Sequence, residues 1–247
     1  MIDWHCHILP GLDDGAADRA QSLAMAAALA AAGFSTVYCT PHLMRGCYEA
    51  ANDQVRRGVS ELQQCLNQEG IPLKLLAGRE YCLDEYLLPA LEDPLPLGDS
   101  RQVLVEIPPG ITADMVRRLS YDMVRAGFTP VIAHPERCHL LEPATDRRAE
   151  GRGLLGALKG MLAGKGRRTM DERLSDTTGN PLLDYLRDLG CSFQGNLGSF
   201  SGFYGRQVRS VAEALHERGL YDRYGSDLHT PEQAARVLCS PRPADAK

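Results

Sequence analysis

The chain has 247 residues, of which 44% are hydrophobic and 24% are charged, and these proportions exclude disordered, collagen-like and fibrous proteins. Its length suits either two small domains or one α/β barrel. The formal net charge of −5 disfavours a broad grip on nucleic acid, which requires a basic face. We therefore expect a folded globular protein that does not have nucleic acid as its partner.

Neither a signal peptide nor a membrane span is predicted. The first fifteen residues contain three Asp and no Lys or Arg, the reverse of a signal peptide. Residues 20–44 lack charged side chains, but Gly33 and Pro41 interrupt them, so a buried helix followed by a strand fits better than a span. The eight cysteines include no Cys-x2-Cys pair, and we interpret them as reduced thiols. Together these features predict a cytoplasmic protein.

Apolar β-rich runs alternate with helical patterns along most of the chain. Strands are predicted at residues 2–5, 36–40, 73–78, 103–107, 130–134, 191–196 and 224–227. Helices are predicted at residues 18–32, 52–68, 113–126, 182–189 and 207–218, four of which are followed directly by glycine as a stop signal. This alternation indicates parallel strands with crossover helices, and seven strands in this rhythm favour a barrel over an open sheet.

One segment interrupts this rhythm. Residues 143–180 are rich in Arg and Gly, with a short helix suggested around residues 154–162. We predict one domain over residues 1–247 that carries this segment as an insertion. The insertion is interpreted either as a solvated surface loop or as a basic lid over an acidic substrate.

Ligand-type side chains follow six of the seven predicted strands. They are His5 and His7, His42, Glu80, Glu106, His134, and the pair Asp227 and His229. Since the carboxyl ends of parallel barrel strands open on one face, these side chains are expected to converge. Histidines and carboxylates together bind Zn, Mn or Fe, and their number exceeds what one ion needs. Taken singly, each could instead be a hydrogen-bonded structural residue or half of an ion pair; together they predict a metal cluster that could hydrolyse a phosphate ester.

A second phosphatase signature competes with the metal cluster. Cys39 and Arg45 have the Cys-x5-Arg spacing of a thiolate-dependent phosphatase loop. Composition alone gives about 0.7 matches of this spacing in such a chain. Pro41 also removes an N–H that such a phosphate-binding loop would use, and no glycine precedes Arg45. We interpret the match as a coincidence.

Seven ordered motifs identify a family resemblance. They read MIDWHCHILPGLDDG, CTPH, GREY, VEIP, AHPER, FQGNLGSFSGFYG and SDLH. They resemble those of the bacterial PHP-superfamily protein-tyrosine phosphatases of capsule and exopolysaccharide synthesis, over residues 1–142 and again over residues 182–229. The resemblance implies an α/β fold, a distorted (β/α)7 TIM-like barrel of the PHP type, with three divalent ions, usually Mn2+; Zn2+, Fe and Mg2+ stay open as alternatives. It also implies a partner, the phosphotyrosine tail of a bacterial tyrosine autokinase.

The same resemblance implies a set of metal ligands. One ion would be held by His5, His7, Glu80 and Asp227; a second by the bridging Glu80 with Glu106 and His134; and the third by Asp14, His42 and His229. Asp13 is the alternative to Asp14, and Asp3 is expected to orient a ligand from behind. Arg137, in the AHPER motif, would bind the phosphate and stabilise its charge.

The chain departs from the family pattern in two places. The Arg/Gly-rich insertion replaces a short connection, and the Arg expected soon after SDLH is absent, with Arg236 too far along. The expected activity is hydrolysis of phosphotyrosine, in which a metal-bound hydroxide attacks phosphorus. The alternatives are another PHP phosphoesterase, such as a histidinol-phosphate phosphatase or a nuclease-like enzyme, and a protein that binds the kinase tail without hydrolysis.

Overall fold

The computed structural model describes residues 1–143 and 178–238. Within them the strands form two parallel sheets. The first has the order β1-β2-β4, with β1 at Ile2–Cys6, β2 at Thr36–Cys39 and β4 at Lys74–Ala77. The second has the order β3-β5-β6-β7-β8-β9, with bounds His42–Leu43, Glu80–Cys82, Gln102–Glu106, Thr129–Ala133, Ser192–Asn196 and Arg223–Gly225. Each of the seven predicted strands corresponds to an observed strand.

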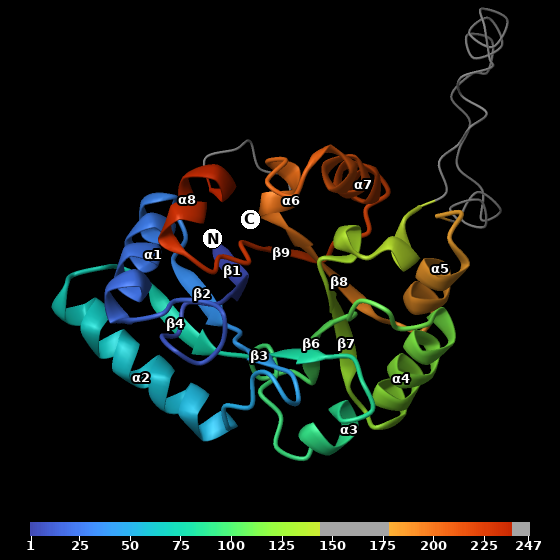
Figure 1. The fold of residues 1–247 in the computed structure, drawn as a ribbon, viewed down its shortest axis with the longest axis horizontal. Helices are drawn as coiled ribbons and strands as arrows, with labels where there is room; N and C mark the ends of the chain where they lie inside the picture. Colours follow the sequence, from blue (N-terminus) through green and yellow to red (C-terminus); the bar gives the residue numbers. More distant parts are fainter. Residues whose placement is uncertain (144–177, 239–247) are drawn as a thin grey trace, which may run out of the picture.

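Short connections in the chain link the first sheet to the second at two points. Strand β2 is followed after two residues by β3, and β4 is followed after two residues by β5. The predicted strands at residues 36–40 and 73–78 are therefore each the first part of an interrupted strand. Pro41, which lacks an N–H for strand pairing, lies in the first interruption. At the opposite edge the Asp227 N–H donates to the His5 carbonyl (2.7 Å) and the His7 N–H to the Leu228 carbonyl (3.0 Å). The strands therefore curl around a common centre (Figure 1).

Helices lie outside the strands (Figure 1). They are α1 (Arg19–Ala31), α2 (Asn52–Gln68), α3 (Leu87–Ala90), α4 (Ala113–Arg125), α5 (Pro181–Asp188), α6 (Leu197–Phe200), α7 (Arg206–Glu217) and α8 (Pro231–Val237), with 3-10 turns at Pro135–Arg137 and His139–Leu141. The five predicted helices are confirmed. Side-chain caps mark the starts of α1, where Asp18 accepts from the Gln21 N–H (2.9 Å), and of α4, where Thr112 accepts from the Met115 N–H (3.3 Å). Helices α3, α6 and α8 are too short for periodicity to reveal.

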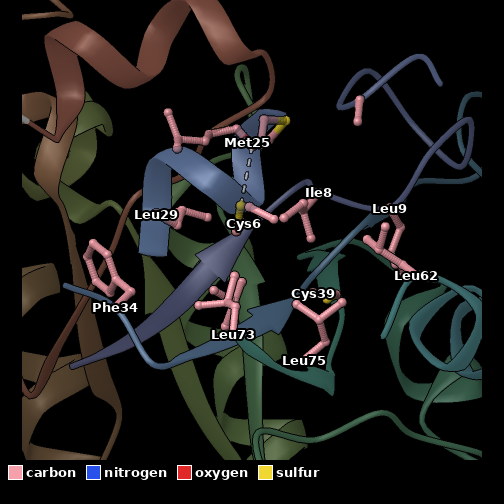
Figure 2. Packing of buried hydrophobic residues seen from close by; sticks show 14 of the residues in the cluster. Cys6, Ile8, Leu9, Met25, Leu29, Phe34, Cys39, Leu62, Leu73 and Leu75 are labelled. Atoms are coloured by element: carbon pink, nitrogen blue, oxygen red, sulfur yellow. Dashed lines mark hydrogen bonds between the residues drawn. The ribbon is translucent and has the colours of Figure 1, made fainter. Parts of the chain in front are cut away.

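The outer faces of the strands pack on these helices. In one cluster Cys6 of β1 and Leu75 of β4 meet Met25 and Leu29 of α1 and Leu62 of α2 (Figure 2). Full burial of such an aliphatic side chain contributes about 1.5–3 kcal/mol. The uncharged segment at residues 20–44 forms α1 and β2, as predicted, and no described helix is long and apolar enough to cross a membrane.

The sequence prediction for residues 143–180 lies almost entirely outside the described residues. This applies to the Arg/Gly-rich insertion and to the short helix around residues 154–162. What is observed is an α/β fold of two curled parallel sheets covered by helices.

Candidate metal centre

The nine predicted ligands lie together, and eight of them fall into three overlapping groups. The groups are His5, His7, Glu80 and Asp227; His7, Asp14, His42 and His229; and His42, Glu80 and Glu106. Within each group the candidate ligand atoms all lie within 4.8 Å of one another. Because His7, His42 and Glu80 are shared, the groups form one continuous cluster suited to several ions.

His134, the ninth predicted ligand, reaches the cluster through an unusual backbone conformation. Alternation along β7 would place it on the outer face with Ile132, which packs against the helices. Instead His134 has φ = +33°, and its Nε2 lies 3.0 Å from Glu80 Oε1. Asp227, with φ = +52°, is the other described non-glycine residue of positive φ. Such backbone costs about 1–3 kcal/mol per residue and is typical of functional sites.

One glycine allows the strands at the site to approach closely. A Cβ at Gly225, the last residue of β9, would lie 2.4 Å from His5 Cβ and 2.8 Å from the His5 nitrogen. Any side chain at this position would push β9 away from β1. Gly225 thus sets the spacing that brings Asp227 to the histidines of β1.

Asp13 and Asp14 have different positions. The Asp13 carboxylate accepts from His7 Nδ1 (2.7 Å) and from the His42 N–H (2.9 Å), and these donors, with His7 foremost, overcome the effect of burial and lower the pKa of Asp13 to about 2. Asp14 is half-exposed, with Oδ1 3.6 Å from the Nε2 atoms of both His42 and His229. Asp13 therefore leaves His7 Nε2 free to bind a metal, and Asp14 is the acidic side chain that faces the cluster.

The electrostatics of the cluster fit bound cations. Burial disfavours the charged form of His5, but Glu80 and Asp227 outweigh it and raise the pKa of His5 to about 9. Burial opposes ionisation of Glu80 and Asp227 too, yet the neighbouring histidines hold both pKa values well below their usual range. Positive charge at this point is thus favourable, and divalent ions would supply it in place of the protons.

Unpaired atoms support the same fit. His42 Nδ1 and Glu106 Oε1 are buried, lie 3.2 Å apart and make no hydrogen bond. His5 Nε2 and His7 Nε2 lie 3.0 Å apart and both face Glu80 Oε2, at 3.0 and 3.3 Å. Since buried polar atoms are normally satisfied, this convergence is typical of groups arranged to coordinate metal ions.

Asp3 acts on the backbone rather than on a ligand side chain. It accepts from the Ser226 N–H (2.7 Å), the Ser226 hydroxyl (2.5 Å) and the His5 N–H (3.2 Å), and burial raises its pKa to about 6. At the other nitrogen of the His5 ring, Gln194 Oε1 lies 2.8 Å from Nδ1. Sequence reasoning missed Gln194, although it lies in the quoted FQGNLGSFSGFYG motif.

Arg137 lies at the edge of the cluster. Its Nη1 donates to Asp227 Oδ2 at 2.7 Å, and 36% of its side chain is exposed. Burial opposes its charge, but Asp227 outweighs burial and raises the pKa of Arg137. Arg236 lies over the Phe203 ring at 4.7 Å.

The competing thiolate signature is not supported by its surroundings. Cys39 is completely buried, and burial raises the pKa of its thiol above the usual value. Arg45 extends over the Tyr86 ring at 4.1 Å. Burial and a raised pKa both disfavour the reactive thiolate, so the surroundings of Cys39 support the interpretation as a coincidence. The seven cysteines within the described ranges are all free.

Parallel strands that curl around a histidine–carboxylate cluster, with an arginine at its edge, define a metal-dependent α/β enzyme. Residues 1–151 match the family described as capsular polysaccharide synthesis, CpsB/CapC, and the chain belongs to this family.

The relatives that the chain resembles are named as tyrosine phosphatases. Tyrosine-protein phosphatase YwqE of Bacillus subtilis (strain 168) is 34% identical over 232 residues, 93% of this chain and 77% of that protein. Tyrosine-protein phosphatase CpsB of Streptococcus pneumoniae is 29% identical over 144 residues, 58% of this chain and 59% of that protein. A crystal structure from work on YwqE and CpsB, described as unique metal-dependent tyrosine phosphatases, superposes with a TM-score of 0.72 at 30% identity, covering 100% of this chain and 89% of that one.

Proposed function

We propose that this protein is a metal-dependent protein-tyrosine phosphatase. The observation that carries the proposal is Arg137, which is bound to Asp227 at the edge of three overlapping ligand groups. Divalent ions and an arginine that face one point can neutralise a phosphate group and its developing charge. The names of the relatives YwqE and CpsB indicate phosphotyrosine as the substrate class.

The cluster would hold three divalent ions, with Mn2+ as the preferred metal and Zn2+, Fe or Mg2+ as alternatives. We assign His5, His7, Glu80 and Asp227 to the first ion, Glu80, Glu106 and His134 to the second, and Asp14, His42 and His229 to the third. The first and third assignments follow observed groups, apart from His7, which faces both. For the second, His42 lies near Glu80 and Glu106, whereas His134 lies at the other oxygen of Glu80. Glu80 would therefore be the residue that the first and second ions share.

The side chains of the chain itself bind and orient the substrate. Bound divalent ions would supply a hydroxide nucleophile at neutral pH and neutralise part of the phosphate charge. Arg137 would bind phosphate oxygens through its guanidinium N–H groups, whose charge Asp227 helps to maintain. A phenol, with a pKa of about 10, leaves with less help from a proton donor than an alkoxide does.

We extend the proposal to the physiological setting and to the complete fold. The substrate would be the phosphotyrosine tail of a bacterial tyrosine autokinase of capsule or exopolysaccharide synthesis, and the protein would act in the cytoplasm. Family membership supports this setting. The strands would form one distorted (β/α)7 barrel of the PHP type, a closure supported by the hydrogen bonds between the ends of β1 and β9.

Hydrolysis of a phosphotyrosine peptide after chelation tests the activity. We expect hydrolysis to stop on chelation, to return with Mn2+, to fail in the His5→Ala/His7→Ala variant and to persist in Cys39→Ser, which serves as the matched control. Activity that ignores the chelator and stops in Cys39→Ser would reject the metal mechanism. Efficient hydrolysis of small phosphate esters with poor peptide turnover would favour another phosphoesterase. Binding of the phosphorylated kinase tail without turnover would favour a binding protein.

A further inference from the structure

The two carboxylate oxygens of Asp227 face different partners. Oδ1 lies 3.4 Å from His5 Nε2 and 3.3 Å from His7 Nε2, inside the metal cluster. Oδ2 points to the edge of the cluster, where it accepts from Arg137 Nη1 (2.7 Å) and Asn196 Nδ2 (2.8 Å). One buried carboxylate therefore joins the metal ligands to the arginine.

Tyr204 lies against the same edge. The Arg137 guanidinium carbon is 4.4 Å from the centroid of the Tyr204 ring, within the range of a cation–π contact. The Tyr204 hydroxyl lies 3.3 Å from Asp227 Oδ2, to which it can donate, and 3.3 Å from Asn196 Nδ2, from which it can accept. The ring and the hydroxyl of Tyr204 thus contact both the arginine and its carboxylate partner.

We propose that Tyr204 is a positioning residue, which fixes the guanidinium plane of Arg137 and thereby sets the affinity for the phosphate group of the substrate. This inference rests on the proposed function. Arg137 is part-exposed, and a free arginine side chain has many rotamers. The hydrogen bond to Asp227 fixes one nitrogen, and the Tyr204 ring fixes the plane. The remaining N–H groups are then held ready to bind a phosphate.

The space for the Tyr204 ring depends on Gly198. A Cβ at Gly198 would lie 2.9 Å from Tyr204 Cε2 and 3.1 Å from Asn196 Oδ1. Gly198→Ala would therefore displace the ring while the tyrosine itself stays in the chain. This gives a second way to disturb the contact with Arg137, one that keeps the tyrosine in the chain.

Two measurements on the Mn2+-loaded protein test the inference: the kinetics of phosphotyrosine-peptide hydrolysis, and calorimetric titration with inorganic phosphate. For Tyr204→Leu we expect KM to rise about tenfold, the Kd for phosphate to rise by the same factor, and the metal content to stay at the wild-type value. Tyr204→Phe, which keeps the ring, should stay within about twofold of wild type, and Gly198→Ala should shift both constants in the direction of Tyr204→Leu.

Tyr185→Leu is the matched control, since Tyr185 is another half-buried tyrosine close to an arginine. The guanidinium carbon of Arg117 on α4 lies 5.9 Å from the centroid of the Tyr185 ring on α5. We expect neither constant to change in it. In an Arg137→Ala background, Tyr204→Leu should have no further effect on KM, because the tyrosine acts through the arginine.

Three results would overturn the inference: additive effects in the double variant, a lowered metal content in Tyr204→Leu, or a kcat loss with unchanged phosphate affinity. If wild type fails to hydrolyse phosphotyrosine while the phosphate titrations follow the expected pattern, the proposed function fails and the role of Tyr204 stands.

Discussion

The candidate metal centre has two halves, which the fold holds in place to different degrees. We define the inner half as His5, Glu80 and Asp227, whose side chains are 0–2% exposed. The outer half is Asp14, His42 and His229, whose side chains are 50%, 12% and 19% exposed. In the inner half His5 lies in β1, Glu80 begins β5 and Asp227 follows β9; in the outer half His42 begins β3, and Asp14 and His229 lie in the segments that follow β1 and β9.

Protein contacts hold the inner half in place. Gln194 orients His5 at 2.8 Å, and Asn196 and Arg137 bind Asp227 at 2.8 and 2.7 Å. The outer half has fewer such contacts. His42 Nδ1 has no hydrogen-bond partner, and Asp14 approaches the two histidines only to 3.6 Å. We infer that the inner half has its final shape before any ion binds, and that the outer half is completed by the ion.

The largest effect is expected at Glu80, on which both halves depend. One of its oxygens lies 3.0 Å from His5 and 3.1 Å from His42, and the other 3.0 Å from His134. Glu80→Gln keeps the shape but removes the charge, so kcat/KM should fall on the order of 10³-fold with a lower metal content. Glu49→Gln, at an exposed glutamate in the loop after β3, is the control and should be neutral. A loss below tenfold at Glu80 would refute its bridging position.

A smaller effect is expected at Asp13, which orients His7, the histidine that is grouped with members of both halves. Its Oδ2 accepts from His7 Nδ1 at 2.7 Å and from the His42 N–H at 2.9 Å. In Asp13→Asn the amide cannot fix the same His7 tautomer at full strength, and metal affinity and kcat/KM should each fall about 10- to 100-fold. Asp18→Asn removes one charge nearby and still caps α1, so it should behave as wild type. Unchanged metal affinity in Asp13→Asn would show that the halves are held independently.

The sequence predicts the inner half better than it predicts the residues that hold the inner half in place. His5, Glu80 and Asp227 are recognisable because charged side chains at strand ends contrast with the apolar strands before them. Gln194, Asn196 and Tyr204 are uncharged, and no periodicity or spacing distinguishes them from ordinary polar residues. Their roles depend on distances between β8, α6 and β9 that only the folded chain sets.

The placement of His42 and His134 likewise depends on strand pairing and backbone conformation in the folded chain. His42 faces Glu80 and Glu106 because a separate strand, β3, starts directly after Pro41 and pairs with β5. In this pairing His42 lies opposite Glu80. Strands of two or three residues are too short for an alternation pattern. His134 is turned inward by its positive φ, which strand alternation would not suggest. The residue types could therefore be predicted from the strand ends, and two of their three groups from the family resemblance, but the approach of His42 to Glu80 and Glu106 could not.

The smallest effect of the three is expected at Asp14, the most exposed member of the outer half. Because its carboxylate is 50% exposed and 3.6 Å from His42 and His229, water can replace it as a ligand at modest cost. Asp14→Asn should lower activity about tenfold at limiting Mn2+ and recover most of it when Mn2+ is in excess, which activity measured across a Mn2+ titration will reveal. Asp188→Asn, at the exposed end of α5, is the matched control and should leave the titration curve unchanged. If instead the loss in Asp14→Asn exceeds a hundredfold and excess Mn2+ does not reverse it, the outer half is as rigidly required as the inner half, and the ion does not complete it.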